Sequence, residues 1–401
     1  MTTLAQWVEV HRLAVAGREP VIARYVGDRV AKVWLRTSRF ADAEALATAT
    51  LTLGPDAGAF YDLGWAQSAT GRPRQALDSY KQALRLYRAA DDHANEAATL
   101  TGIGLAYNRL GDRRQALTFY ERALPIMREV GDRGGEAVTL SNIGGVYAGL
   151  GDRRQALTFY ERALPILREV GDRAGEATTL NNIGLVYAGL GDRRRALAYY
   201  EWVLPIAREV GDRAGEATTL NNIGRVYIEL GDRRRALAYY ERVLPIAREV
   251  GDRAGEAVTL NNIGAVYAGL GDLRLALNFY EQALSIRREV GDRAGEAVTL
   301  NNIGRVYAGL GDRRQALTYY EQALPIRREV GDRVGEAATR YNIAMIHRDV
   351  GHLDEAIGEL ELVVDLERQI GQPNAAETAM LEQLRQERAT AQQPDPSPEQ
   401  G

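Results

Sequence analysis

Apolar residues recur along most of this chain in two helical patterns that alternate and repeat every forty residues. In one copy, the first pattern places apolar or small residues at i, i+3, i+4 and i+7, which lines one face of a helix; these are Leu180, Ile183, Gly184 and Tyr187. The second pattern in that copy comprises Ala196, Tyr200, Val203, Leu204 and Ala207. No useful length of sequence alternates apolar and polar residues, so strands are not expected. Each copy is predicted to be a pair of helices.

The copies are nearly identical in the middle of the chain. Residues 171–210 and 211–250 differ at only four positions, which are Leu185/Arg225, Ala188/Ile228, Gly189/Glu229 and Trp202/Arg242. The same frame fits the blocks that begin at 131, 251, 291 and 331 without a gap. A looser copy begins at Asp91, and a more diverged one covers the region of residues 57–90.

The two helices of a copy are separated by Gly191-Asp192. Glycine adopts the left-handed conformation that ends a helix, and aspartate caps the next one. The loop Gly211-Asp212-Arg213 repeats this signal between copies. Where Gln follows Asp by three residues, as in Asp112 and Gln115, the sequence allows a capping box.

A single helix pair cannot cover its own apolar face, whereas stacked pairs cover it everywhere except at the two ends. The fold class is therefore predicted to be an all-α solenoid. We divide the chain into an N-terminal capping helix at 1–23, a solenoid at 24–376, a C-terminal capping helix at 377–390 and a disordered tail at 391–401. The units of the solenoid are 24–56, 57–96, 97–136, 137–176, 177–216, 217–256, 257–296, 297–336 and 337–376.

Composition limits the chemistry that the chain can perform. With 50 basic and 54 acidic residues the net charge is −4, which leaves no basic footprint for nucleic acid. Cys is absent and His occurs four times, so thiol nucleophiles and zinc clusters are not expected. No phosphate-binding loop or nucleophile elbow occurs. The carboxylates recur once in each forty-residue copy, which is typical of residues that belong to the scaffold. Without an apolar run of 18 residues or a secretory signal, we expect a cytoplasmic, non-enzymatic protein that needs no cofactor or metal and does not bind a membrane.

The pattern Leu-x-x-Ile-Gly-x-x-Tyr, followed by Gly, Ala, an aromatic residue and Ala-Leu, resembles the tetratricopeptide repeat (TPR), whose usual period is about 34 residues. The matching residues are Leu180, Ile183, Gly184, Tyr187, Gly191, Ala196 and Tyr200, while Val203 departs from the pattern. Thr179–Tyr187 is similar to repeats of kinesin light chains. The Arg-Glu-Val-Gly-Asp-Arg loop is similar to the spindle-orienting G-protein-modulator proteins and to TPR arrays of bacterial signalling proteins. The resemblance implies a right-handed TPR superhelix of about nine units, with the first helices on its concave side.

The candidate binding residues lie on the face of each first helix opposite the packed stripe, at positions 178, 181, 185 and 188–189. An asparagine amide can pair with the N–H and C=O of any peptide, and an arginine can hold a carboxylate. The candidate partner-binding residues are Asn181, Asn221, Asn261, Asn301, Arg225, Arg305, Leu185 and Tyr341. The resemblance to kinesin light chains implies peptide contact for the four asparagines only. The spindle-orienting repeats carry their asparagine one position after the Gly, where this chain has Leu185, Arg225 and Ala265, so their ligand class does not transfer.

Structural alternatives stand beside each of these assignments. The Asn181-type residues can instead be solvated or bond between repeats, and the neighbouring Asn182-type residues are expected to bond backbone between helices. Arg225 and Arg305 can pair with groove acids such as Glu229. The many Arg–Glu pairs, such as Arg208-Glu209, are expected to be solvated and to contribute only tenths of a kcal/mol each.

Three non-catalytic functions fit this sequence. The first is an adaptor whose groove holds a peptide or a helix of a partner protein. The second is a regulatory sensor in which a ligand changes the superhelical pitch and so controls a separate effector. The third is a scaffold that stacks end to end, which the polar helix at Ala375–Arg388 argues against, so we expect a monomer.

Overall fold

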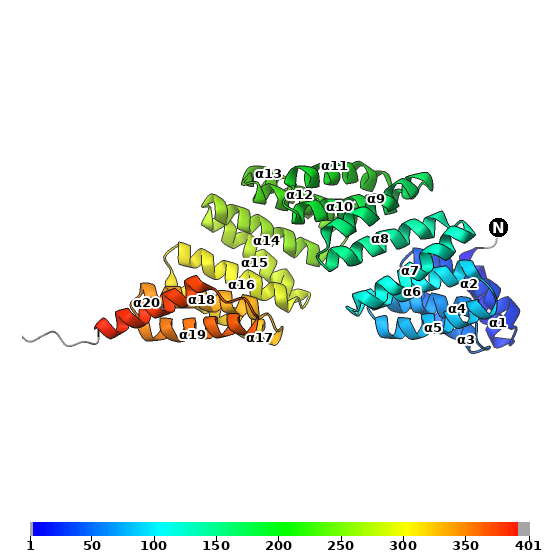
Figure 1. Ribbon diagram of the computed structural model, residues 1–401, viewed down its shortest axis with the longest axis horizontal. Coiled ribbons are helices and arrows are strands. Elements are labelled where there is room, and N and C mark those ends of the chain that lie inside the picture. The colour runs from blue at the N-terminus through cyan, green and yellow to red at the C-terminus, as the bar shows by residue number, and fades with distance from the viewer. Residues whose placement is uncertain (1–2, 392–401) are drawn as a thin grey trace, which may run out of the picture. The chain divides into compact units, whose positions relative to one another are not determined.

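The computed structural model describes residues 3–391, and these residues form twenty α-helices and no strand (Figure 1). The predicted all-α class is therefore confirmed. The tail predicted at 391–401 lies, apart from Ala391, outside the described residues. No helix in the described range is long and apolar enough to cross a membrane.

The chain divides into two units, Met1–Gly211 and Asp212–Gly401. The helices of the first unit are α1 (Leu4–Ala16), α2 (Pro20–Arg36), α3 (Phe40–Leu51), α4 (Ala57–Ala69), α5 (Pro73–Ala89), α6 (His93–Arg109), α7 (Arg113–Val130), α8 (Arg133–Gly149), α9 (Arg153–Glu169), α10 (Arg173–Gly189) and α11 (Arg193–Glu209). Those of the second are α12 (Arg213–Glu229), α13 (Arg233–Glu249), α14 (Arg253–Leu270), α15 (Leu273–Glu289), α16 (Arg293–Gly309), α17 (Arg313–Glu329), α18 (Arg333–Asp349), α19 (Leu353–Gln369) and α20 (Ala375–Ala391). From α4 to α19, even-numbered helices are the first helix of a copy and odd-numbered ones the second.

The loops form as the Gly-Asp pairs predict. Gly191 has φ 80°, the left-handed conformation that an L side chain rarely adopts, and Asp192 Oδ1 accepts a hydrogen bond from the Arg195 N–H at 3.0 Å. At Asp112 only half of the capping box forms. The Asp112 carboxylate accepts from the Gln115 N–H at 3.1 Å, but its own N–H donates to the Tyr107 carbonyl at 3.0 Å and is not available to the Gln115 side chain.

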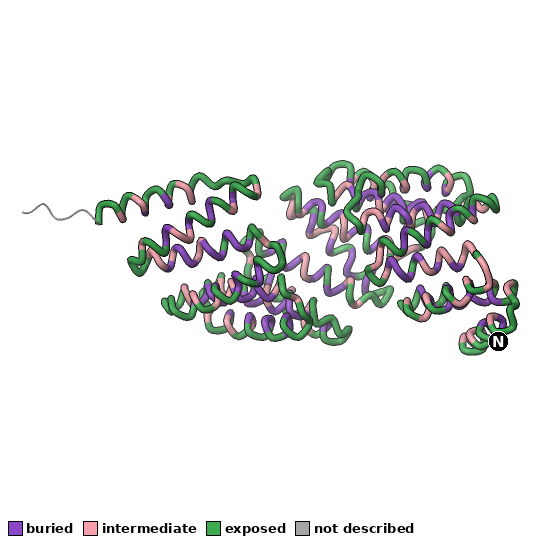
Figure 2. Tube along the Cα trace, turned by 90° about the horizontal axis from the view of Figure 1, so that it is seen from below, coloured by how far each residue is buried: buried purple, intermediate pink, exposed green. Residues whose placement is uncertain are grey.

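The apolar stripes of both helices pack into the core, as their spacing predicts. Within each unit, a core cluster joins a second helix to both helices of the next copy; one such cluster contains Tyr120 of α7, Ile143 of α8 and Leu167 of α9. Figure 2 shows the result as buried stretches that alternate with exposed ones along each helix.

The Gly184 column comprises the residues at this position in successive copies. In most copies a tyrosine ring of the second helix occupies the space that a side chain at this position would need. A Cβ atom on Gly264 would lie 2.8 Å from Cδ1 of Tyr280, closer than van der Waals contact allows. The ring of the second helix therefore packs directly on the backbone of the first. In the last copy the pair is Ala344 and Leu360, both fully buried, and the smaller Leu leaves room for the methyl group of Ala.

Ion pairs join successive copies at the loops between them. Glu176, which is only 3% exposed, accepts from Arg168 Nε at 2.7 Å and is also held by Arg173. Arg173 in turn donates to Glu209 at 2.8 Å. The same arrangement recurs at Glu136, Glu256 and Glu296.

The expectation that such pairs are solvated is wrong for these glutamates and right for Glu209, whose side chain is 56% exposed. Burial acts to raise the pKa of Glu136, but the hydrogen bonds from Arg128 and Arg133 outweigh it and hold that pKa below its ordinary value. The first helices α8, α10, α14 and α16 thus each begin with a buried carboxylate that two guanidinium groups neutralise.

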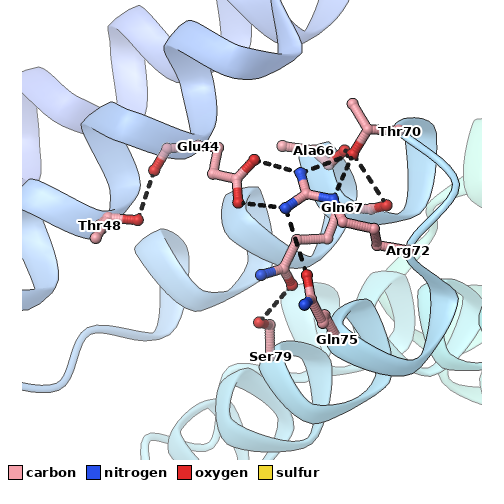
Figure 3. Close-up of polar contacts among 8 residues, drawn as sticks. All are labelled: Glu44, Thr48, Ala66, Gln67, Thr70, Arg72, Gln75 and Ser79. Atoms are coloured by element: carbon pink, nitrogen blue, oxygen red, sulfur yellow. Dashed lines mark hydrogen bonds and ion pairs between the residues drawn. The ribbon is translucent and has the colours of Figure 1, made fainter.

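A polar pair replaces a stacked aromatic pair in the copy that α4 and α5 form (Figure 3). In later copies two aromatic residues stack, as Tyr147 and Phe159 do at 5.4 Å. At the equivalent positions the buried Ser79 hydroxyl donates to Gln67 Oε1 at 2.8 Å. Arg72 occupies the place of the capping Asp and reaches back to Glu44 of α3 at 2.8 Å. This copy is therefore held to the preceding helix by an ion pair.

One column of the core changes from apolar to charged along the chain. Its members in successive copies are all buried, and they are Met127, Leu167, Ala207, Ala247, Arg287, Arg327 and Glu367. Each of the charged side chains has replaced an apolar one at the same packing position. For example, Leu167 lies against the first turn of α10 at Gly175, and Arg287 lies against the first turn of α16 at Gly295.

Candidate functional site

Successive first helices contact one another within each unit, as α8 contacts α10 and α14 contacts α16. The solvent side of these helices, which we call the first-helix face, is where sequence analysis places the binding residues. It is built on a column of buried threonines, among them Thr139, Thr259 and Thr299, which are all 0% exposed. The hydroxyl groups of this column bond to the preceding copy and so fix the distance between neighbouring first helices.

The predicted binding asparagines take part in those bonds. Asn221 Nδ2 donates to Thr259 Oγ1 at 3.2 Å, and Asn261 Oδ1 accepts from Thr299 Oγ1 at 3.3 Å. Asn301 Oδ1 accepts from Thr339 Oγ1 at 3.2 Å. Where Asn is absent a hydroxyl takes its place, since Ser141 Oγ lies 3.1 Å from Thr179 Oγ1 in the first unit.

These asparagines are half-buried, and so is Asn181. They form the inter-repeat bonds that the sequence left open as an alternative. Two of the Asn182-type residues bond between copies, but to side chains rather than to backbone: Asn302 Nδ2 donates to Asn261 Oδ1 and Asn342 Nδ2 donates to Asn301 Oδ1, both at 3.2 Å. Within the described residues, the Nδ2 groups of Asn261 and Asn301 make no hydrogen bond and remain available for a ligand.

Arg225 and Arg305 are exposed on the first-helix face. Neither makes an ion pair with any residue in the described range 3–391, so the alternative of pairing with Glu229 is not what the structure shows for Arg225. Arg305 Nη2 makes one long hydrogen bond, of 3.4 Å, to Asn302 Oδ1. Both guanidinium groups therefore keep most of their donors for a ligand.

The two remaining candidates lie in different surroundings. Leu185 is 37% exposed on the face of α10. Tyr341 is half-buried and packs against the core cluster that α18, α19 and α20 share. The structure thus leaves Leu185 accessible, whereas most of the Tyr341 ring contributes to the end of the solenoid.

A pocket of about 410 Å³ opens on the first-helix face between α8 and α10, with α9 as its floor. Three of its lining residues have little or no side chain: Gly145, Ala148 and Gly189. The others are Arg153, Tyr160, Asn182, Leu185 and Val186. A Cβ atom on Gly145 would lie 3.6 Å from Tyr160 Oη, so the phenol group faces the space that a side chain at Gly145 would fill.

Two further pockets lie between successive first helices, three copies after this one and two copies before it. The pocket between α14 and α16 has a volume of about 330 Å³ and is lined by Ala265, Ala268, Gly269, Leu273, Arg305 and Val306. Another, of about 280 Å³, includes Trp65, Tyr80 and Leu105 between α4 and α6. The arginine of the α8–α10 pocket belongs to the second helix, whereas Arg305 in the α14–α16 pocket belongs to the first helix. The hollows therefore differ in volume and in the helix that supplies the positive charge.

Arg153, Tyr160 and Gly145 line this pocket although none of them is among the binding residues predicted from the sequence. Tyr160 is the equivalent of Tyr200, which belongs to the apolar stripe of its helix, and the Tyr160 ring is buried, which raises the pKa of its hydroxyl to about 12. Two signals could have pointed to the pocket: a Gly at a position where other copies carry Leu or Arg, and a second-helix Arg beside it.

Comparison with known proteins supports this description of the fold. Models of the tetratricopeptide repeat match residues 31–89, 87–129, 135–209, 203–249, 215–289, 255–329 and 295–369. No curated protein sequence matches the chain.

Several solved structures are similar. BtubC (BKLC) from P. vanneervenii is 25% identical, with a TM-score of 0.50, over 55% of this chain and 92% of that one. The apo form of the quorum sensor NprR from B. thuringiensis is 17% identical, with a TM-score of 0.62, over 85% and 97%. A Signal Transduction ATPase with Numerous Domains protein from Pyrococcus horikoshii, which has a tetratricopeptide repeat sensor, is 16% identical with a TM-score of 0.69. That match covers 90% of this chain and 54% of the other.

Proposed function

This chain belongs to the tetratricopeptide repeat family, and we propose that it is a non-catalytic adaptor that binds a peptide or a helix of a partner protein. The proposed binding surface is the first-helix face, which would form a concave groove. One observation carries this proposal: the copies repeat their packing residues but differ on this face. Leu185 in one copy is Arg225 in the next, and Ala188 is Ile228. A purely structural array has no need of such differences on an exposed face.

The chemistry of the face suits a polypeptide. The free Nδ2 donors of Asn261 and Asn301 can bind carbonyl groups of an extended chain whatever its side chains are. Arg225 and Arg305 add charge selectivity, because a guanidinium group that makes no internal ion pair can bind a carboxylate of the ligand in a bidentate manner. The hollows between first helices can receive side chains. We therefore propose that Asn261 and Asn301 of the second unit act on the backbone of the ligand, while Arg225, Arg305 and the hollow between α14 and α16 select its sequence.

Peptide selection tests this proposal. A random twelve-residue peptide library would be selected on the whole protein, and the affinity of each recovered peptide measured by fluorescence anisotropy. Replacing both Arg225 and Arg305 with Leu should weaken acidic peptides by about tenfold or more, since each charged hydrogen bond contributes about 1.5–3 kcal/mol. Leu occupies the equivalent position at Leu185, so the fold should tolerate the change.

The matched control for this experiment is Arg242→Gln. Arg242 is exposed on a second helix, and Gln282 is its equivalent one copy further on. This substitution removes a positive charge without touching the first-helix face, so it should leave the affinity unchanged. Failure to recover any peptide, or equal losses with the control, would contradict the adaptor proposal.

A ligand-responsive regulator of a bacterial signalling system is the second candidate. It is favoured by the buried column that changes from Leu167 to Arg287 and Arg327. A buried guanidinium group keeps part of its desolvation penalty, so the repeats that pack on it are held less tightly. A ligand could then change the pitch of those repeats and act on a separate effector. A ligand-dependent change in small-angle X-ray scattering would favour this role over a rigid adaptor, whose scattering profile would not change.

We also propose that the protein is a cytoplasmic monomer that binds neither nucleic acid nor membrane. Near-identical copies can stack end to end if their ends are uncapped. Light scattering at rising concentration distinguishes the two states: a constant molecular mass supports the monomer, and a rising mass supports self-assembly.

A further inference from the structure

We propose that the N-terminal end of the first unit binds an amphipathic α-helix of a partner protein, on a surface that α1 and α2 share. We call this surface the terminal seat, and it comprises Trp7, Val10 and Leu13 of α1 with Val33 of α2. It includes none of the groove residues named above, so this inference goes beyond the proposed function. The seat lies wholly within the first unit, in the helices labelled α1 and α2 in Figure 1.

Helix α1 takes the place that a second helix has in later copies. The loop after α1 makes the same hydrogen bond as the loop after α9: the Glu19 N–H donates to the Ala14 carbonyl at 2.8 Å, and the Asp172 N–H donates to the Leu167 carbonyl at 2.9 Å. This alignment makes α1 a second helix and α2 the first helix of the copy that follows. The second helices from α5 to α19 each pack on the first helix of their own copy. Among the described residues, no such helix lies on α1.

Two residues of α1 are left open for this reason. Val10 is 38% exposed and Leu13 is 54% exposed. Their equivalents in α15 are Ala283 and Ile286, which are both buried and share a core cluster with Leu260 of α14, the first helix of the same copy. A first helix thus covers in α15 the face that α1 exposes.

Helix α2 has a similar opening on the side that faces a preceding first helix. Val33 is 42% exposed, whereas its equivalents Val146 and Val306 are buried. Val306 lines the hollow between α14 and α16, so this column faces the preceding first helix. Exposure of Val21 has no such meaning, because its equivalent Val334 is exposed as well.

The open faces of α1 and α2 form one surface. The guanidinium carbon of Arg29 lies 5.7 Å from the centroid of the Trp7 ring and 4.6 Å from that of Tyr25. Arg29 is one helical turn before Val33 on α2, so both residues lie on the same side of that helix. The seat therefore runs from the aromatic ring of α1 to the valine of α2.

An apolar end is not a property of every terminal helix of this chain. In the second unit, exposed side chains of α20 form ion pairs with α19, since Arg385 pairs with Glu361 at 2.7 Å and Arg388 pairs with Asp354 at 3.0 Å. The terminal units of a solenoid need a polar outer face to stay soluble. The N-terminal end departs from this rule, which favours a bound partner there.

Later copies indicate which helix fits the seat. The first helix α14 carries apolar residues at i, i+3 and i+7 and Gly264 at i+4. The glycine is needed because its Cβ would lie 2.8 Å from Cδ1 of Tyr280. Trp7 has the place of Tyr280 in α1, so the partner helix should carry Gly or Ala against it. Docking of an apolar helix face into a matching surface is a common mode of recognition.

The test uses a library of eighteen-residue helical peptides built from Ala, Glu, Lys and Gln, with positions i, i+3, i+4 and i+7 of one stripe randomised. The library would be selected on the whole protein, and affinities measured by fluorescence anisotropy. We expect apolar residues at i, i+3 and i+7 with Gly or Ala at i+4. Replacing that small residue of the peptide with Leu should weaken its binding to the wild-type protein by about tenfold or more, because the new side chain meets the Trp7 ring.

Variants of the protein locate the site. Leu13→Gln combined with Val33→Thr should weaken the selected peptides by about 10- to 100-fold, because both side chains lose apolar contact with the bound helix. Both positions are exposed in the free protein, so the variant should melt like the wild type. Val21→Thr is the matched control. It makes the same kind of change on α2 outside the seat, and it should alter the affinity by less than about twofold.

Each outcome supports or overturns the inference. Equal binding by the Leu13/Val33 variant overturns it, and so does a selected stripe that tolerates Leu at i+4. A molecular mass that doubles in light scattering and returns to that of one chain in the variant would assign the seat to a second copy, which also overturns it.

The adaptor proposal is tested separately. Replacing Arg225 and Arg305 with Leu should leave binding of the selected helices unchanged, because neither arginine belongs to the seat. If helices bind the seat but no peptide binds the first-helix face, the adaptor proposal alone fails. If acidic peptides bind that face and no helix is selected on the seat, this inference alone fails.

Discussion

The contact between Gly264 and Tyr280 allows a quantitative test of the packing between the two helices of a copy. A Cβ atom on Gly264 would lie 2.8 Å from Cδ1 and 2.9 Å from Cε1 of the Tyr280 ring, which is 0% exposed and has no room to turn. Gly264→Ala should gain about 1 kcal/mol from helix propensity but lose about 1–3 kcal/mol to overpacking. We expect a net loss of stability of up to about 2 kcal/mol, taking the difference of those two figures.

The natural pair Ala344 and Leu360 shows how the clash can be relieved. In a Tyr280→Leu background the ring is gone, so Gly264→Ala should become neutral or stabilise the protein by up to about 1 kcal/mol, the helix-propensity gain alone. Tyr280→Leu by itself is destabilising because it shortens a buried side chain. The effect of Gly264→Ala thus changes sign between the two backgrounds, and the coupling falls in the range of about 0.5–3 kcal/mol found for residues in contact.

The four proteins of this double-mutant cycle would be compared by urea unfolding followed by circular dichroism. Because repeat arrays do not always unfold in a single step, hydrogen exchange of α14 and α15 would locate the loss. Equal destabilisation by Gly264→Ala in both backgrounds would refute the argument that the ring excludes a side chain at this position.

Three other measurements follow from buried charged groups. Burial lowers the pKa of Arg287, which reflects the cost of keeping its charge in the core. Arg287→Leu removes that cost and restores apolar packing, so it should stabilise the second unit by about 1–4 kcal/mol; a lower urea midpoint would contradict this. Burial, with Asp28 nearby, raises the pKa of Asp62 to about 8 from an unfolded value of about 3.9. Its contribution to stability is therefore full below about pH 4 and lost as the pH rises through about 8, so Asp62→Asn should flatten the fall in melting temperature between pH 5 and 9. Glu256→Gln should cost about 1.5–3 kcal/mol, whereas the exposed Glu289→Gln should cost less than about 0.5 kcal/mol, and similar losses in both would show that burial of Glu256 is unimportant.

The fold was predictable from the sequence because its signals are local. Gly191 and Asp192 end one helix and begin the next through their own backbone and side chain, and the spacing of Leu180, Ile183 and Tyr187 identifies the buried face directly. Neither inference needs knowledge of the neighbouring copy. Repetition then supplies the neighbour, since each copy must pack on another like itself.

The contacts between copies were harder to predict. Glu176 looks like any exposed residue in a charged loop, and its burial depends on arginines before and after it in the chain. The Asn181-type asparagines could either contact a ligand or bond between repeats. The second role depends on a threonine 38 residues further along the chain, such as Thr259, to which Asn221 donates. The α8–α10 pocket was missed because a pattern search looks for side chains, and this site begins with the absence of one at Gly145.

The buried column that begins at Met127 and ends at Glu367 also bears on how the chain folds as it is made. During synthesis, the helix pairs whose column residue is apolar leave the ribosome first. The helix pairs whose column residue is charged follow, and they pack onto repeats that have already folded. A folding nucleus can therefore form in the N-terminal helix pairs, and folding can proceed from it toward the C-terminus. Local unfolding should begin in the C-terminal helix pairs and proceed toward the N-terminus.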